Sequence, residues 1–135
     1  MSSILAISSG DPAGIGPEII AKSWMARNER GLPPFFAIGD PASFERVWNG
    51  PIRLIDSPQE TPGCFESHLP VLRVADCGPT QPGKPDPDGA RCALQALELA
   101  VGLARSGSVQ GVVTGPISKV LLQEVGFTHP GQTEF

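Results

Sequence analysis

A glycine-rich run near the amino terminus has the first residue types that suggest chemistry: Gly10-Asp11-Pro12-Ala13-Gly14-Ile15-Gly16-Pro17-Glu18. Glycine has no Cβ and tolerates positive φ, so such a run lets the backbone approach a bound molecule closely. Pro17 suits the first position of a helix, and Glu18 is favoured at the positive end of the helix dipole. Gly14 and Gly16 are therefore candidate cleft residues, while Asp11 is either a turn residue or a neighbour of a bound ligand.

Two nucleotide-binding patterns are present only in part. A dinucleotide fingerprint needs glycine or alanine three residues after Gly16, where this chain has Ile19. The run 78–84 matches a phosphate-binding loop up to Lys84, but Pro85 follows in place of the serine or threonine that binds magnesium. An extended surface connection is the preferred interpretation of this run. A phosphate- or nucleotide-binding module without redox activity remains the alternative from a different class.

Further polar candidates stand near the end of the chain. Lys119 closes the run Thr114-Gly115-Pro116-Ile117-Ser118-Lys119 and is either a ligand for a phosphate or carboxylate or a solvated helix lysine. Gln132 and Thr133 follow a flexible glycine in Pro130-Gly131-Gln132-Thr133-Glu134-Phe135, which composition alone predicts to be a turn. Neither histidine of the chain has other ligands at metal-binding spacing.

These candidates need an α/β scaffold to position them. Apolar runs predict strands, and helical periodicity between them predicts helices, so the sheet is expected to be largely parallel. Asp88 is the expected N-cap of the clearest helix and Gly107 its end. In such a sheet, ligands gather at the carboxyl ends of the strands, where the Gly10 loop and the 114–119 run both fall. Strands are expected near 4–8, 34–38, 52–55, 70–74 and 109–113, helices near 17–27, 41–48, 89–105 and 117–125, and an irregular segment at 57–63.

The tetrapeptide that begins the glycine-rich run occurs twice, as Gly10-Asp11-Pro12-Ala13 and as Gly39-Asp40-Pro41-Ala42. Aspartate as a cap with proline just inside the helix is a general way to begin a helix. We therefore expect little functional information in the first four residues of the run.

Composition narrows the class of protein. The 135 residues are 40% hydrophobic with a net charge of −4, and they contain no Tyr, two Trp and scattered basic residues, so nucleic acid is not an expected partner. No signal-like segment or membrane span is predicted, which favours a cytoplasmic protein. The three cysteines lack redox or zinc spacing and are expected to be plain thiols. Because no cap, charged tail or linker precedes Phe135, the chain is expected to be the amino-terminal part, 1–135, of a longer protein.

The runs 10–18, 114–119 and 130–135, taken together, resemble the 4-hydroxythreonine-4-phosphate dehydrogenase (PdxA) family in order and spacing. The resemblance implies a three-layer α/β/α fold of the isocitrate/isopropylmalate dehydrogenase type. It also implies a homodimer that uses NAD (or NADP) and a divalent metal such as Zn, Mg or Co. The implied reaction oxidises and decarboxylates 4-phosphohydroxy-L-threonine during pyridoxal 5'-phosphate synthesis. In the family three histidines hold the metal, and the resemblance places them beyond Phe135, so no catalytic or metal residue is expected in this chain.

The family's substrate contacts fall on Gln132 and Thr133. The family pattern reads Gly-His-Thr-Glu, and this chain has Gln132 in the histidine position. Glutamine keeps hydrogen-bonding capacity but cannot become cationic, so a protonated imidazole is lost as a partner for an anionic substrate. A related dehydrogenase for another phosphorylated hydroxy acid is therefore the second hypothesis.

Overall fold

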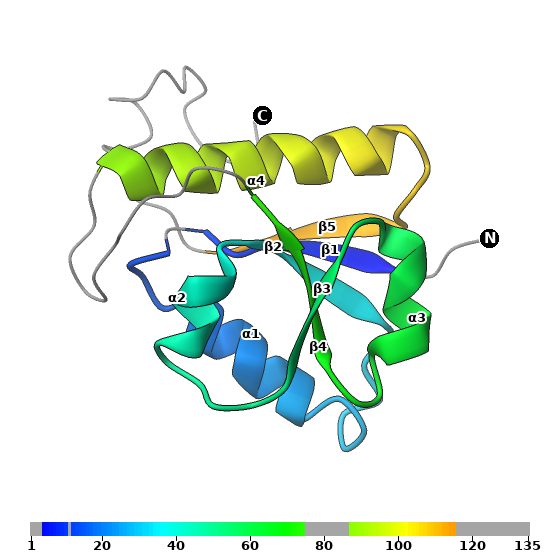
Figure 1. The fold of residues 1–135 in the computed structure, drawn as a ribbon. Coiled ribbons are helices and arrows are strands. Elements are labelled where there is room, and N and C mark those ends of the chain that lie inside the picture. Colours follow the sequence, from blue (N-terminus) through cyan, green and yellow to red (C-terminus); the bar gives the residue numbers. More distant parts are fainter. Residues whose placement is uncertain (1–3, 11, 75–86, 116–135) are drawn as a thin grey trace.

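The computed structural model describes residues 4–10, 12–74 and 87–115 and confirms the predicted α/β fold (Figure 1). Five strands alternate with helices along the chain. The elements are β1 (Leu5–Ser8), α1 (Gly16–Met25), β2 (Phe35–Gly39), α2 (Pro41–Glu45), β3 (Ile52–Ile55), the 3₁₀ helix η1 (Pro58–Glu60), α3 (Thr61–Cys64), β4 (Leu69–Arg73), α4 (Pro87–Arg105) and β5 (Gly111–Thr114).

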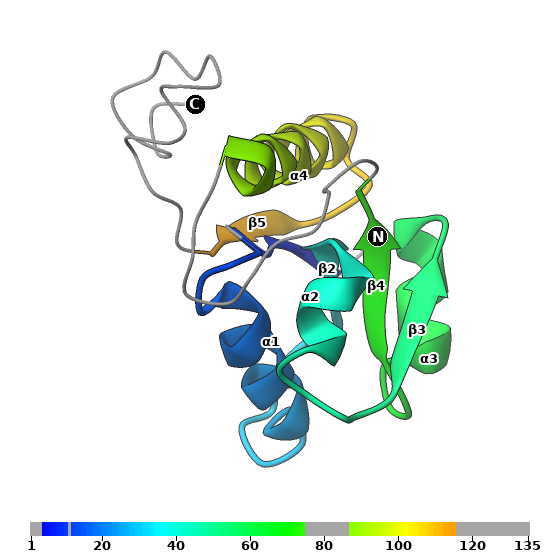
Figure 2. The same ribbon diagram turned by 60° about the vertical axis from the view of Figure 1, so that its left-hand side comes forward.

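The strands form one parallel sheet in the order β3-β4-β2-β1-β5. The connection from β1 through α1 leads to β2 on one side, whereas the connection from β4 through α4 passes across the sheet to β5 on the other side. Since parallel crossovers are right-handed, a change of direction moves the connecting helix to the opposite face. Figure 2 shows this result: α1 and α2 cover one face and α4 covers the other, which gives three layers.

The alternation of side chains along each strand builds a separate core on each face. Ile4 and Ala6 pack in the cluster under α4, whereas Leu5 and Ile7 pack against the cluster on the side of α1. This period of two is the normal geometry of a strand, and apolar residues at both parities are typical of a parallel strand covered by helices on both faces. The centre of the sheet is therefore shielded from water. The groups of the sheet that solvent or a ligand can reach lie at the ends of the strands.

The ends of the helices show which sequence signals were correct. Asp40 caps α2 by accepting a hydrogen bond from the Ala42 amide at 3.0 Å. Gly107 adopts φ 79° after α4, and its amide donates to the Ala104 carbonyl at 3.1 Å, so the predicted end of this helix is confirmed. Asp88, however, lies inside the first turn of α4, which begins at Pro87. The N-cap prediction for Asp88 is wrong.

Two further expectations need correction. The segment 57–63 is not irregular, because the capping box of Ser57 and Glu60 starts η1 and α3 follows directly. Cys64 is a free thiol, but Cys92 is disulfide-bonded, so the prediction of plain thiols is wrong for Cys92. The helix expected over 117–125 lies outside the described residues. Within the described ranges, no helix is both long and apolar enough to cross a membrane.

Candidate functional site

The carboxyl end of β1 is the best position for a ligand site in this fold. From β1 the chain moves to β2 on one side, and from β4 it later crosses past β2 and β1 to β5 on the other side. The strand order therefore reverses between β1 and β5. Open parallel sheets bind ligands outside the carboxyl ends of the strands at such a reversal. In the structure, Gly10 and Gly115 follow the carboxyl ends of the neighbouring strands β1 and β5, whereas residues 116–119 of the predicted run lie outside the described residues.

Backbone hydrogen bonds continue past the strand ends and hold this edge together. The Gly115 amide donates to the Ser8 carbonyl at 2.7 Å, and the Ser9 amide donates to the Ile38 carbonyl at 3.0 Å. The end of β1 is thereby attached to both of its neighbours. Gly10 follows with φ 76°, a left-handed conformation that favours glycine, and turns the chain out of the sheet.

Residues Pro12–Ile15 form turns and bends before α1 begins at Gly16. Gly14 is exposed, and Ile15 is 59% exposed. No side chain of the described residues caps α1. Because Pro17 has no amide hydrogen, only Gly16 and Glu18 carry a first-turn amide that can donate to water or to an anion. Glu18 in that turn forms an exposed pair with Lys22 at 3.4 Å, and its negative charge opposes the approach of an anion.

The two copies of Gly-Asp-Pro-Ala therefore differ in structure. After Asp40 the helix begins at once, whereas after Pro12-Ala13 it begins only at Gly16. The first copy is followed by a turn that the second copy lacks. This turn, which includes Gly14, distinguishes the end of β1 from the end of β2.

The structure places only some of the predicted site residues. Gly14 and Gly16 lie at the predicted edge, as the last part of the turn and the first residue of α1. Asp11, Lys119, Gln132 and Thr133 lie outside the described residues, as does the run 78–85. Their roles therefore stay predictions.

Sequence reasoning missed Ser8, Ser9 and Gly39 at this edge. Ser8 is fully buried, and its hydroxyl makes no hydrogen bond within the described part of the chain. Ser9 is 1% exposed and lies between the ends of β2 and β5. The signal that was available is the recurrence of glycine at the ends of three adjacent strands, at Gly10, Gly39 and Gly115.

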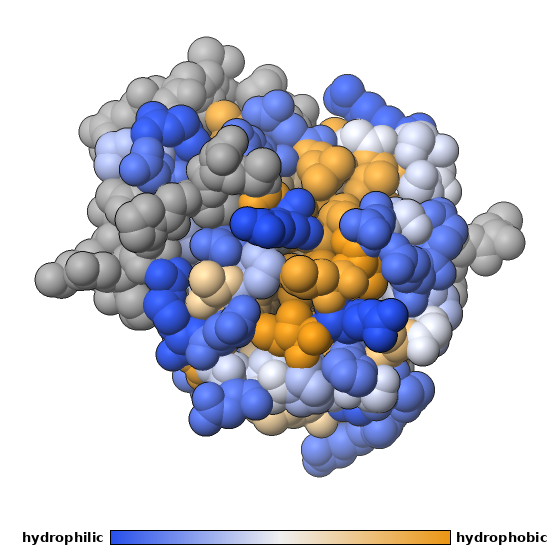
Figure 3. Space-filling model, in the orientation of Figure 1, coloured by the Kyte–Doolittle hydropathy of each residue, from blue (hydrophilic) through white to orange (hydrophobic). Residues whose placement is uncertain are grey.

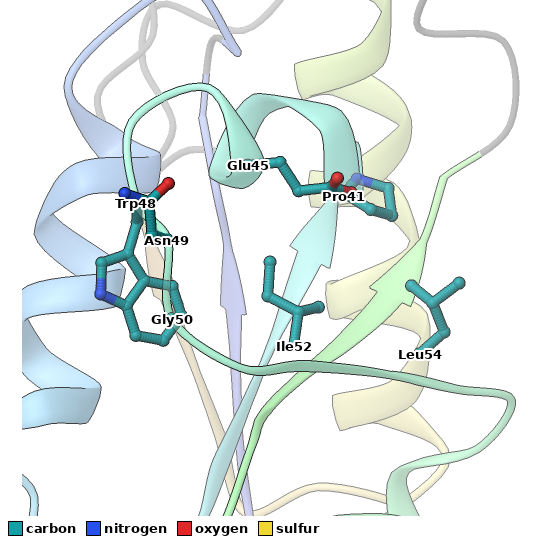
Figure 4. Close-up of a pocket in the computed structure, with 7 residues that line it drawn as sticks. All are labelled: Pro41, Glu45, Trp48, Asn49, Gly50, Ile52 and Leu54. Atoms are coloured by element: carbon teal, nitrogen blue, oxygen red, sulfur yellow. The ribbon is translucent and has the colours of Figure 1, made fainter.

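A groove along the described residues lies elsewhere, beside the edge strand β3. It measures about 480 Å³, and Figure 4 shows Ile52 and Leu54 of β3 facing Trp48 and Glu45 across it. An apolar patch covers this part of the surface (Figure 3), and Leu54 is 53% exposed. Glu45 is the only charged residue of the lining, so the groove offers no cation to a negatively charged ligand. We therefore place the candidate site at the end of β1.

A smaller pocket of about 260 Å³ contains Cys64. Burial raises the pKa of this thiol, nearby Arg53 opposes the shift, and Glu60 adds to it. A thiol with a raised pKa forms little thiolate near neutral pH and is a poor nucleophile. Within the described ranges, no group of three or more His, Cys, Asp or Glu side chains could bind a metal ion.

Comparison with known proteins agrees with this arrangement of elements. A family described as the pyridoxal phosphate biosynthetic protein PdxA matches residues 32–135. The chain belongs to the PdxA family. Its sequence is 47% identical over 131 residues to 4-hydroxythreonine-4-phosphate dehydrogenase from Zymomonas mobilis, with 97% of this chain and 39% of the relative covered.

Two solved structures extend the PdxA comparison. A 4-hydroxythreonine-4-phosphate dehydrogenase from Burkholderia phymatum superimposes with a TM-score of 0.85 and 27% identity, covering 99% of this chain and 42% of that one. A terephthalate 1,2-cis-dihydrodiol dehydrogenase from Burkholderia xenovorans gives a TM-score of 0.73 and 25% identity, covering 97% of this chain and 39% of that one. The chain thus spans about 40% of the length of the PdxA proteins that it matches.

Proposed function

We propose that this chain is part of a longer enzyme that oxidises 4-phosphohydroxy-L-threonine with NAD (or NADP) during pyridoxal 5'-phosphate synthesis. The observation that carries the proposal is the similarity to curated 4-hydroxythreonine-4-phosphate dehydrogenases, at 46% to 48% identity over 97% of this chain. The family assignment and the shared fold support it. We also propose that the enzyme acts as a homodimer, as the family resemblance implies.

The chemistry follows from the substrate. Oxidation of its secondary alcohol, which is adjacent to a carbon with an amine and a carboxylate, produces a β-keto acid that loses carbon dioxide readily. A bound nicotinamide cofactor would supply the hydride acceptor, and a bound divalent metal would supply stabilisation of the negative charge that develops during the oxidation. The family resemblance assigns the three metal-binding histidines to the part of the enzyme beyond Phe135.

In this proposal the chain supplies the scaffold and one side of the substrate site. The proposal is supported by the strand order, in which the turn 12–15 and Gly115 follow the carboxyl ends of two neighbouring strands. The proposed substrate contacts are Gln132 and Thr133, and Lys119 follows β5 closely enough in sequence to be a candidate partner for the phosphate. The amides of Gly16 and Glu18, at a helix start that no described side chain caps, are further candidate donors near the end of β1.

Gln132 supports a second candidate, a dehydrogenase for another phosphorylated hydroxy acid. A histidine at this position could carry a positive charge next to an anionic substrate, whereas a glutamine offers only neutral donors and an acceptor. The terephthalate diol dehydrogenase among the similar structures carries a name with a different substrate. Substrate preference is therefore the property that separates the two candidates.

The test uses the full-length protein with divalent metal and NAD. Wild type and Gln132→His are compared on 4-phosphohydroxy-L-threonine and on a panel of other phosphorylated hydroxy acids. The leading proposal predicts NADH formation by both proteins on 4-phosphohydroxy-L-threonine. Turnover of a different acid by wild type, with a return of preference in Gln132→His, would favour the second candidate. Absence of NADH with every acid, while a PdxA relative is active in the same assay, would contradict both.

A further inference from the structure

Ser9 is enclosed by two glycines that come from different strands. Gly39 is the last residue of β2, and Gly115 follows the last residue of β5. Neither glycine has a positive φ, in contrast to Gly10. Their backbone conformations would therefore accept an L-amino acid, and the reason for glycine must be sought in the space around them.

That space is filled by Ser9 and Gly10. A Cβ at Gly39 would lie 2.3 Å from the Ser9 Oγ and 3.0 Å from the Ser9 Cβ. A Cβ at Gly115 would lie 2.5 Å from the Ser9 carbonyl oxygen and 3.0 Å from the Gly10 nitrogen. The first contact is with a side chain, whereas the second is with backbone that no rotamer change can move.

Two glycines that lie inside helices have open space around them and serve as matched controls. A Cβ added at Gly63 or Gly102 would meet nothing within 4 Å. Ser9 is 1% exposed and cannot move outward without displacing its neighbours. Backbone hydrogen bonds on both sides of β1 also resist a shift, since Ser8 accepts from Gly115 and Ser9 donates to Ile38.

We propose that Gly39 and Gly115 are positioning residues that set the place of the Ser9-Gly10 backbone, and through it the turn that carries Gly14 and Ile15. This inference rests on the proposed function, because it assigns the turn to the binding of the phosphorylated substrate or the cofactor at the carboxyl edge of the sheet. A side chain at Gly115 pushes directly on the backbone that begins the turn. A side chain at Gly39 acts through the Ser9 side chain, so removal of that side chain relieves it.

The experiment compares four variants in the full-length protein: Gly115→Ala, Gly39→Ala, and the controls Gly63→Ala and Gly102→Ala. Displacement of a binding element by about 1 Å can reduce turnover a hundredfold, so we expect kcat/KM to fall between about tenfold and a hundredfold in Gly115→Ala. The controls should keep wild-type kinetics. Hydrogen exchange of the peptide that contains Gly14 and Ile15 should accelerate in Gly115→Ala and not in the controls.

A compensation experiment separates positioning from general damage to the fold. Adding Ser9→Gly removes the two atoms that Gly39→Ala would meet but leaves the carbonyl and amide that Gly115→Ala would meet. We therefore expect Ser9→Gly to restore kinetics and exchange in Gly39→Ala and to leave Gly115→Ala impaired. If Gly115→Ala fails to fold, the comparison of Gly39→Ala with the double variant Gly39→Ala/Ser9→Gly tests the inference by itself.

Unchanged exchange and kinetics in folded Gly115→Ala or Gly39→Ala would overturn the inference, as would a Ser9→Gly change that fails to rescue Gly39→Ala. Hydrogen exchange needs no enzymatic activity. If wild type lacks dehydrogenase activity while the exchange pattern follows the prediction, the proposed function fails and the positioning of the turn stands. If wild type is active while exchange and kinetics ignore the substitutions, the positioning inference fails alone.

Discussion

Trp24 connects α1 to the chain segment before β4, and its replacement by phenylalanine should destabilise the protein more than the same change at Trp48. Trp24 is 6% exposed, and its indole Nε1 donates to the Phe65 carbonyl at 2.8 Å. The Arg27 guanidinium lies 3.6 Å above its ring. Phenylalanine keeps an aromatic ring in the core but cannot donate that hydrogen bond.

The magnitude follows from what the substitution leaves behind. A buried carbonyl without its donor costs about 1–3 kcal/mol. Removal of part of the indole leaves a small cavity worth about 1 kcal/mol more. Trp24→Phe should therefore lower the free energy of unfolding by about 2–4 kcal/mol. Trp48 is only partly buried and contacts Trp24 edge-on at 5.6 Å, so Trp48→Phe should cost about 1 kcal/mol or less.

Urea denaturation followed by far-ultraviolet circular dichroism measures both costs without using tryptophan emission as the signal. With a typical urea dependence, Trp24→Phe should move the midpoint down by roughly 1–2 M. Equal shifts for the two variants, or a smaller shift for Trp24→Phe, would refute the reasoning. They would show that the hydrogen bond from Trp24 to the Phe65 carbonyl does not contribute the stability assigned to it.

Three other predictions concern helix ends, helix interiors and alkaline pH. Asp40→Ala removes the cap that holds the Ala42 amide and should cost about 1 kcal/mol, whereas Asp40→Asn should cost little, both by urea denaturation. Gly102→Ala should stabilise the protein by about 1 kcal/mol, since the site lies inside α4 with open space for a methyl group; a lower midpoint would contradict this. Because burial raises the pKa of the Cys64 thiol, its contribution to stability is present below the pKa of the unfolded chain and is lost as pH rises through the folded pKa. The urea midpoint should fall more steeply with alkaline pH in wild type than in Cys64→Ala, and parallel curves would count against it.

The general architecture could be predicted because local patterns determine it. The strand Ile52–Ile55 was predicted with its observed bounds, and the periodicity of 89–105 identified α4. Errors occurred where two local signals compete: Pro87 begins α4 and moves Asp88 inside its first turn, and Ser57 and Glu60 form a capping box in a segment rich in turn residues. Such competition is decided by hydrogen bonds that composition does not describe.

The candidate site was only partly predictable, because its contacts join residues that are distant in sequence. The chain position of Gly39 and Gly115 does not show that both approach Ser9, since this requires the strand order and the register. A local difference also matters: α2 begins directly after Asp40, whereas the turn that includes Gly14 lies between Ala13 and the start of α1. The pairing of distant strands therefore determines the contacts of Ser9, which local sequence patterns do not predict.

The most direct test of the proposed function is simultaneous measurement of NADH formation and carbon dioxide release when the full-length protein, with metal, acts on 4-phosphohydroxy-L-threonine. The proposal predicts that both products appear together and in equal amounts. Full-length protein that forms neither product, while a PdxA relative forms both in the same assay, would contradict it.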